Sequence, residues 1–208
     1  MINGIDVSRH QGYIDWGKVK PHIDFAMIRA GFGDNNLDAK ALFNMAQCER
    51  FNIPFGVYWF SYALHPEMAR KEADYCLDIV GKRKLAFPVV YDFEYDTVNH
   101  AIKQGAKVDR AFVLNCTREF CKRVEERGFY AMFYTNNDYY KRYYQGSDIP
   151  QKYDMWYARY ADQPGIGVNL WQKTDRGKIP GITGYVDLDV SYRDYQTIMD
   201  KNDLNNYD

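Results

Sequence analysis

The sequence predicts an α/β fold, namely a single-domain, irregular and contracted (β/α) barrel, and three observations indicate it. Short runs of β-branched and aromatic residues alternate with amphipathic segments whose apolar residues recur every three or four positions. Eight such runs are candidate strands, a number that suits closure into a TIM-barrel-like barrel. The chain has 208 residues, whereas a full barrel of this kind needs about 250, so we expect loops in place of some helices.

The candidate strands are bounded by turn residues. In chain order they cover residues 4–7, 24–30, 54–60, 87–93, 130–135, 154–160, 168–172 and 185–190. Apolar residues at helical spacing predict helices over residues 38–52, 66–80 and 108–127. Pro66 suits the first turn of the second helix, and Asn52 and Gly128 suit the ends of the first and third. After residue 145 the connections are too short for full helices, so we expect loops between the last strands.

No shift in composition, low-complexity segment or internal repeat divides residues 1–195, which we therefore predict to be one domain. Residues 196–208 are polar and rich in Asn and Asp, which suggests a frayed tail or a linker stub. The third predicted helix carries basic residues, for which a solvated helix face is a better interpretation than a docking surface. They are Arg110, Arg118, Lys122, Arg123 and Arg127.

The charge balance argues against some classes of partner. With 27 basic and 28 acidic residues the net charge is −1, so no overall field would attract nucleic acid or an anionic membrane. The N-terminus lacks a basic stretch followed by an apolar one, and no run of about 18 apolar residues occurs. We expect neither an export signal nor a membrane span in the chain as given.

Cysteine and histidine residues are scattered without the spacing of metal ligands. They are Cys48, Cys76, Cys116 and Cys121, and His10, His22, His65 and His100. We expect no metal site, no cofactor and no disulfide, with the cysteines reduced and mostly buried as small hydrophobic residues.

The candidate chemistry begins at FPVVYDFEYDT, residues 87–97, where an apolar strand ends with Asp92 and Glu94 two positions apart. Residues i and i+2 of a strand share a face, with Cα atoms about 6.6 Å apart. Carboxylates this close resist joint ionisation, so one pKa must rise. Such a pair is ordinarily interpreted as two solvated acids in a loop. The rest of the chain decides between that interpretation and a functional pair of carboxylates.

In a barrel of this kind the carboxyl ends of the strands meet at one mouth. The residues predicted there are carboxylates, large aromatics, an arginine and a glutamine. This mixture suits a carbohydrate because aromatic faces stack on sugar rings while polar groups bind hydroxyls. Beyond Asp92 and Glu94 they are Asp6, Tyr58, Trp59, Tyr62, Tyr134, Trp156, Tyr157, Arg159, Trp171, Gln172, Asp187 and Asp189.

Several stretches in order resemble glycoside hydrolase family 25 lysozymes: GIDVSRHQGYIDWGKVK, MIRAGFG, FGVYWFSYA followed by EA, VVYDFEY, FYTNNDYY, MWYARYAD and LWQKTDRGKIPGITGYVDLDV. The resemblance covers residues 4–192 and implies an irregular (β/α) barrel without a metal. It implies an N-acetylmuramidase that cleaves the β-1,4 bond between N-acetylmuramic acid and N-acetylglucosamine in peptidoglycan. Residues 1–195 would be the catalytic domain.

Carried over position by position, the family's catalytic acid falls on Glu94, its partner on Asp92, and two further active-site aspartates on Asp6 and Asp187. We expect Glu94 to be protonated and Asp92 to stay anionic, with Asp6 and Asp187 as neighbours across the barrel seam in a supporting role. The resemblance and the strand ends together assign substrate contacts to Tyr58, Trp59, Tyr62, Tyr134, Trp156, Tyr157, Trp171, Gln172 and Asp189.

Two positions depart from the family pattern. His10 replaces the usual aromatic before the first Gln-Gly, and Asp189 replaces a common Asn. Neither removes a catalytic carboxylate, but both affect the expected substrate contacts, and His10 is expected to make activity more sensitive to pH near neutrality.

The spacing of Asp92 and Glu94 does not choose between retention and inversion at the anomeric carbon. The pair resembles that of family 18 chitinases, which use the substrate's acetamido group as the nucleophile. We therefore hypothesise that Asp92 orients the acetamido group while Glu94 protonates the leaving oxygen, so that the product keeps its β configuration.

Two other classes of function stay open. A divalent-metal hydrolase would also cluster carboxylates, and it would lose activity on chelation. A silent wall-binding module would not clear a suspension of bacterial walls. We expect a monomer whose partner is the peptidoglycan glycan strand of the bacterial wall, either as a phage endolysin released through a holin or as an autolysin.

Overall fold

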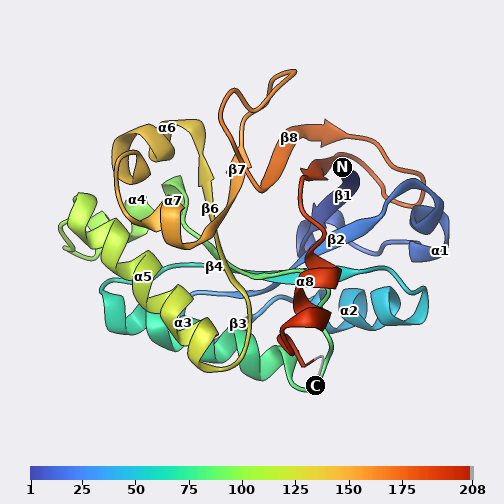
Figure 1. The fold of residues 1–208 in the computed structure, drawn as a ribbon, viewed down its shortest axis with the longest axis horizontal. Coiled ribbons are helices and arrows are strands. Elements are labelled where there is room, and N and C mark those ends of the chain that lie inside the picture. The colour runs from blue at the N-terminus through green and yellow to red at the C-terminus, as the bar shows by residue number, and fades with distance from the viewer. Residues whose placement is uncertain (207–208) are drawn as a thin grey trace.

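The computed structural model describes residues 1–206 and shows a closed barrel of eight strands with helices packed around it (Figure 1). The barrel strands are β1 Ile2–Val7, β2 Phe25–Phe32, β4 Phe55–Phe60, β5 Val89–Asp92, β6 Ala131–Asn136, β7 Asp154–Ala158, β8 Leu170–Gly177 and β9 Val186–Ser191. A two-residue strand, β3 Asn36–Leu37, pairs with the end of β2 alone. The eight predicted strands are confirmed, with bounds that differ by a few residues.

The barrel is mixed in strand direction. From β1 through β2, β4, β5, β6 and β7 to β8, neighbouring strands are parallel. The last strand, β9, is antiparallel to both β8 and β1 and closes the sheet between them. Its register pairs Asp187 with Asp6, so the prediction that these aspartates are neighbours across the seam is confirmed.

The three predicted helices are present as α2 Ala41–Arg50, α3 Pro66–Val80 and α5 Arg110–Glu126. A further helix, α4 Tyr95–Lys103, follows β5 and was not predicted, because residues such as Thr97, Val98 and Asn99 have low helix propensity. The remaining helical segments are short: η1 Arg9–Gln11, α1 Trp16–Val19, η2 Lys20–His22, α6 Asn137–Tyr139, η3 Tyr140–Tyr144, α7 Ile149–Lys152 and α8 Tyr195–Lys201. Among residues 1–206, none of the helices combines the length and apolar character that a membrane crossing requires.

The connections after β7 confirm the predicted contraction. In the described part of the chain, loops without a helix join β7 to β8 and β8 to β9. An antiparallel connection needs only a turn, whereas a parallel one needs a crossover. The reversal of β9 therefore lets the chain complete the barrel in fewer residues.

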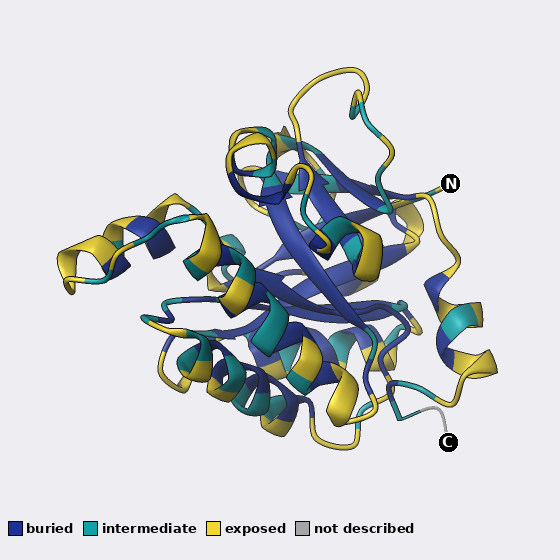
Figure 2. Cartoon of the chain, turned by 60° about the vertical axis from the view of Figure 1, so that its left-hand side comes forward, coloured by how far each residue is buried: buried dark blue, intermediate teal, exposed yellow. Residues whose placement is uncertain are grey.

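Side chains of the barrel strands alternate between the inside of the barrel and the layer beneath the helices. Most strand residues are buried (Figure 2). The inner cluster contains Phe25, Met27, Tyr58, Phe87, Val90, Met132, Tyr134, Trp156 and Leu170. Gly4 makes room for it, because a Cβ there would lie 2.5 Å from the Phe25 ring, which stacks on Phe87 at 4.3 Å. All four cysteines are free and buried, as predicted, and Cys48, Cys76, Cys116 and Cys121 all lie in the outer cluster.

The expected frayed tail is wrong for residues 196–206, and only residues 207–208 lie outside the described part of the chain. Tyr195 and Met199 of α8 are fully buried in the inner cluster and close the end of the barrel opposite the mouth. Asn205 is also fully buried. Its side chain donates to the carbonyls of Leu85 and Phe87, both at 3.0 Å, and accepts from the Tyr130 amide at 2.7 Å. The polar composition concealed this role because a single amide can satisfy three buried backbone groups.

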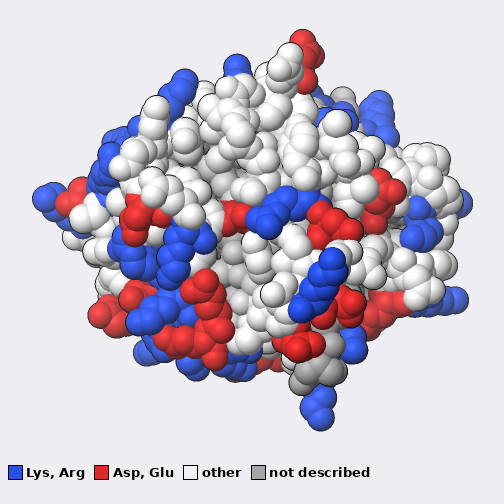
Figure 3. Space-filling view, in the orientation of Figure 1, with Lys and Arg blue, Asp and Glu red and all other residues white. Residues whose placement is uncertain are grey.

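Three of the basic residues in and directly after α5 are paired with acids, and acidic and basic residues are mixed on this face (Figure 3). Asp74 of α3 accepts from both Arg123 and Arg127 at 2.8 Å, and Arg118 pairs with Asp148 at 2.9 Å. Pairs this exposed contribute little each. They leave the α3–α5 face with interspersed positive and negative charge.

We predict that Asn205→Ala lowers the free energy of unfolding by about 2–4 kcal/mol, because it leaves three buried backbone groups unpaired. It also places Ala at φ 57°, a left-handed conformation that Asn tolerates better. Urea unfolding followed by circular dichroism measures this. The control Asn202→Ala removes one exposed bond to the Ile198 carbonyl and should change stability by less than about 0.5 kcal/mol. Equal midpoints for the two variants would contradict the prediction.

Candidate active site

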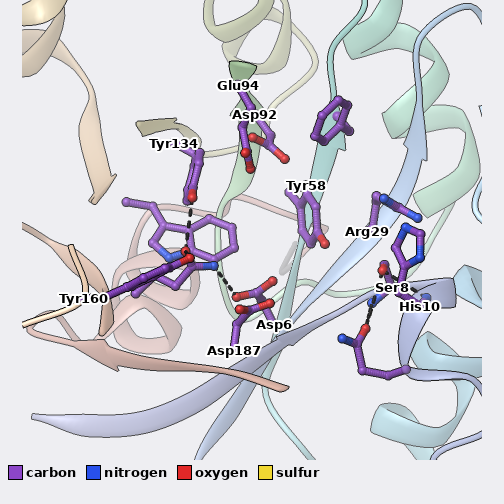
Figure 4. Close-up of a pocket in the computed structure, with 14 residues that line it drawn as sticks. Asp6, Ser8, His10, Arg29, Tyr58, Asp92, Glu94, Tyr134, Tyr160 and Asp187 are labelled. Atoms are coloured by element: carbon purple, nitrogen blue, oxygen red, sulfur yellow. Dashed lines mark hydrogen bonds between the residues drawn. The ribbon is translucent and has the colours of Figure 1, made fainter. Parts of the chain in front are cut away.

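A cavity of about 350 Å³ opens at the mouth of the barrel, where the parallel strands end. Four carboxylates line it from two sides (Figure 4). Asp92 and Glu94 lie together on one side, and Asp6 and Asp187 lie together on the other, with Tyr58 between the pairs. The full lining is Asp6, Ser8, His10, Gln11, Arg29, Tyr58, Phe60, Asp92, Glu94, Tyr134, Trp156, Tyr160, Gln172 and Asp187.

Backbone alternation brings Asp92 and Glu94 to the same cavity. Asp92 is the last residue of β5 and is 4% exposed. Phe93 turns the opposite way and is fully buried in the outer core. Glu94 keeps an extended backbone, with φ −128° and ψ −174°, as the residue that starts α4. The prediction that both carboxyl groups face the same way is therefore confirmed.

Asp6 and Asp187 belong to a hydrogen-bonded cluster around Gln172. The Gln172 side chain donates to Asp6 Oδ2 at 2.8 Å, and its Oε1 accepts from the Tyr134 hydroxyl at 3.1 Å. The Tyr160 hydroxyl lies 3.3 Å from the same oxygen. Gln172 thus connects Asp6 to two tyrosines of the cavity lining.

Burial raises the pKa of Glu94 to about 7, and the charges of Asp187 and Asp96 add to the rise. Burial also raises the pKa of Asp92 well above its usual range, and the charge of Glu94 adds to that rise while Arg29 opposes it. Asp92 Oδ1 is buried without a hydrogen-bond partner in the described residues. Burial of Asp92 therefore works against the anionic state that we expect for it, and the charge of Arg29 works in favour of that state.

The aspartates of the seam are also shifted. Burial, followed by the charges of Asp187 and Asp189, raises the pKa of Asp6, while the bond from Gln172 opposes the rise. Burial and the charge of Asp175 raise the pKa of Asp187 to about 6. The carboxyl groups of the cavity therefore keep their protons to a higher pH than carboxyl groups exposed to water do.

Asp189 lies beneath the cavity and does not line it. It is fully buried, accepts from the Trp156 indole N–H at 2.8 Å, and has its pKa raised to about 8 by burial. Its predicted direct contact with substrate is wrong; it holds the Trp156 ring that forms the floor.

The predicted aromatic residues divide by face. Tyr58, Tyr134 and Trp156 line the cavity. Trp59 and Tyr157 each follow a cavity-lining residue by one position, so their side chains point the opposite way. They face the outer core, where both are fully or almost fully buried. Trp171 is out of phase with Gln172 and donates to the Arg159 carbonyl at 2.8 Å. Tyr62 follows the end of β4 and packs against Phe60 and His100 outside the lining.

Five further residues line the cavity that the sequence did not predict as site residues. They are Ser8, Gln11, Arg29, Phe60 and Tyr160. Arg29 carried a usable signal, because a basic residue within an apolar strand is rarely buried without a partner. That partner is Asp38, to which Arg29 donates at 2.8 Å. His10 also lines the cavity, but partial burial and the nearby Arg29 and Arg9 lower its pKa, so it titrates further from neutrality than expected.

A second cavity of about 390 Å³ adjoins the first. Glu94, Tyr134 and Tyr160 line both. The other residues around the second cavity are Tyr95, Asn136, Asn137, Asp138, Ala158 and Arg159. Glu94 therefore lies at the junction of a longer cleft. Across the described residues, no group of three or more His, Cys, Asp and Glu side chains has an arrangement that could hold a metal ion.

The comparisons with known proteins agree with this architecture. The model of Glycosyl hydrolases family 25 matches residues 5–182. The uncharacterized protein YegX of Escherichia coli is 29% identical over 199 residues, covering 91% of this chain and 69% of YegX.

Two solved structures share the fold. The modular autolysin LytC from Streptococcus pneumoniae superimposes with a TM-score of 0.80 at 24% identity, covering 92% of this chain and 46% of LytC. This chain thus spans about half the length of LytC, which has also been solved with a synthetic peptidoglycan ligand. The bacterial lysozyme from Streptomyces coelicolor superimposes with a TM-score of 0.79 at 22% identity, covering 100% of this chain and 98% of that one. Because the family model matches most of the chain, which folds as its solved neighbours do, the chain belongs to glycosyl hydrolases family 25 and is a glycoside hydrolase.

Proposed function

We propose that the chain is a lysozyme that cleaves the β-1,4 bond between N-acetylmuramic acid and N-acetylglucosamine in bacterial peptidoglycan. The observation that carries this proposal is the position of Glu94 at the junction of two adjoining cavities. A glycosidic bond has a sugar on each side, so an acid that protonates its oxygen must stand between two binding sites. Family membership and the solved neighbours named as a lysozyme and an autolysin support this substrate class.

Glu94 is proposed as the general acid. Its pKa of about 7 keeps the carboxyl group protonated at mildly acidic pH, where an exposed glutamate would have lost its proton. After the leaving sugar departs, the same group as a carboxylate can remove a proton from the incoming water.

Asp92 is proposed to accept a hydrogen bond from the acetamido N–H of the muramic acid unit, whose carbonyl oxygen attacks the anomeric carbon. This role needs an ionised Asp92 beside a protonated Glu94. The two states favour each other, because the negative charge of Glu94 is one cause of the raised pKa of Asp92 and disappears when Glu94 is protonated. The positive charge of Arg29 further favours the ionised Asp92.

The other lining residues are proposed to bind the sugar. Tyr58 and Trp156 contact each other edge to face, with ring centroids 5.7 Å apart, and give the cavity an apolar floor. Asp6, Asp187 and Gln172 offer hydrogen-bond acceptors and a donor to sugar hydroxyls or water. Among the sequence candidates, Trp59, Tyr157 and Trp171 have no place in this proposal.

We predict that Glu94→Gln lowers turnover by about two to four orders of magnitude, the usual contribution of a general acid, and that Asp92→Asn is nearly as damaging. The assay is release of muropeptides from purified walls, with mass spectrometry to identify muramic acid at the new reducing end. The control Glu49→Gln changes a surface residue at the end of α2 and should leave the rate unchanged. Near-normal release by Glu94→Gln would remove the proposed acid.

We predict a bell-shaped pH dependence whose alkaline limb falls near the Glu94 pKa of about 7, because the acid must be protonated to act. The acid limb should reflect ionisation of Asp92. Asp96→Asn removes a charge that raises the pKa of Glu94, so it should move the alkaline limb to lower pH. Rates measured from pH 4 to 9 test both statements, and a flat profile would refute the assignment.

We predict that the released sugar initially keeps the β configuration, since attack by the acetamido group and then by water inverts the anomeric carbon twice. Proton NMR of fresh product, recorded before mutarotation, reads the configuration directly. An initial α-anomer would mean a single displacement by water and would eliminate the role given to the acetamido group and to Asp92.

A further inference from the structure

Behind the cleft wall, between β4, β5, α3 and α4, lies a group of buried polar side chains that no cavity at the mouth exposes. Ser61 and Thr97 are fully buried, and Glu72 is 2% exposed. None of the three lines either cavity. Burying a carboxyl group among apolar residues is costly unless it is hydrogen-bonded, so this arrangement calls for an explanation.

Thr97 joins this group to Glu94. The Glu94 amide donates to Thr97 Oγ1 at 3.1 Å, and the Thr97 hydroxyl donates to the Ser61 carbonyl at 2.7 Å. One hydroxyl therefore fixes Glu94, the N-cap residue of α4, against the chain that follows β4. Without it, the Glu94 amide would have no side-chain acceptor at the start of the helix.

Ser61 joins the same group to Asp92. Its amide donates to the Asp92 carbonyl at 2.9 Å, which extends the β4–β5 pairing by one step past the cleft. Its hydroxyl donates to Glu72 Oε2 at 2.6 Å and lies 3.0 Å from the Tyr91 hydroxyl.

Glu72 holds the turn in place from α3. Its second oxygen, Oε1, accepts from the Tyr62 amide at 2.8 Å, so one carboxyl group binds two consecutive residues after β4. The Ser61 hydroxyl also accepts from the Ala63 amide at 3.1 Å. The segment after β4 is thereby fixed at three successive positions.

We propose that Ser61, Glu72 and Thr97 form a buried frame whose function is to position the backbones of Asp92 and Glu94, which makes them positioning residues for the hydrolysis. This inference rests on the proposed function of the cleft. The two carboxyl groups act on one sugar from backbone positions two residues apart, so their separation is set by the backbone at residues 92–94. A displacement of about 1 Å in such a pair can cost about 100-fold in rate.

The test compares two buried threonines. Thr97→Val replaces the hydroxyl by a methyl group of similar size, and it should lower kcat by about 10- to 100-fold with KM nearly unchanged on soluble glycan fragments. Thr97→Ser keeps the hydroxyl and should restore kcat. The control Thr117→Val removes a hydroxyl that is equally buried in α5 and donates to the Val113 carbonyl at 2.9 Å, and it should keep the parental kcat despite a similar loss of stability.

Glu72→Gln tests the other end of the frame, because the amide nitrogen that replaces one carboxyl oxygen cannot accept the hydrogen bond that Ser61 or Tyr62 donates there. It should lower kcat in the same direction, and it decides the matter if Thr97→Val does not fold. With an active parent and an inactive Glu94→Gln, a parental kcat in Thr97→Val or Glu72→Gln would overturn the frame alone. An equal loss in Thr117→Val would do the same, because it would reflect packing. A parent that releases no muropeptides would overturn the proposed function and the frame with it.

Discussion

Closure of the barrel by a reversed strand is the constraint on which the cleft depends. Because β9 is antiparallel to both of its neighbours, its first residues lie at the mouth, beside the last residues of the parallel strands. Asp187 therefore meets Asp6 at the seam. A parallel β9 would have brought the other end of the strand to the mouth and would have needed a longer crossover connection. One change of direction thus shortens the chain and completes the ring of carboxylates.

The carboxylate cluster is unfavourable for folding and favourable for chemistry. Burial is the largest cause of the raised pKa values of Asp6, Asp92, Glu94, Asp187 and Asp189, and mutual repulsion adds to several of them. Bonds from Gln172 and Trp156 and the charge of Arg29 offset part of the cost. Two oxygens, Asp92 Oδ1 and Asp189 Oδ2, still have no partner in the described residues. Burial of the apolar layers on both sides of the strands offsets the unfavourable free energy of burying these carboxyl groups.

The two ends of the barrel accordingly have different characters. At the mouth, polar groups with raised pKa values face a cavity, and the frame of Ser61, Glu72 and Thr97 holds the backbone beneath them. At the opposite end, buried side chains of α8 close the barrel, and the Asn205 side chain is hydrogen-bonded to backbone carbonyls. This division matches the general behaviour of barrels, in which the carboxyl ends of the strands carry chemistry and the other end carries stability.

The sequence by itself determined the eight strands, the contraction after residue 145 and the shared face of Asp92 and Glu94, because all of these follow from local periodicity and chain length. Alternation also separates Tyr58 from Trp59 and Trp156 from Tyr157, once one residue of each strand is known to face inward. Only the tertiary structure decided which residues of each strand face inward, since this depends on which side of the strand meets the helices. It also decided that Arg29 is held by Asp38, that burial raises the pKa of Asp92, and that the polar segment around Asn205 closes the barrel. Each of these depends on partners distant in sequence, and burial and pairing are properties of the assembled neighbours, which no local pattern encodes.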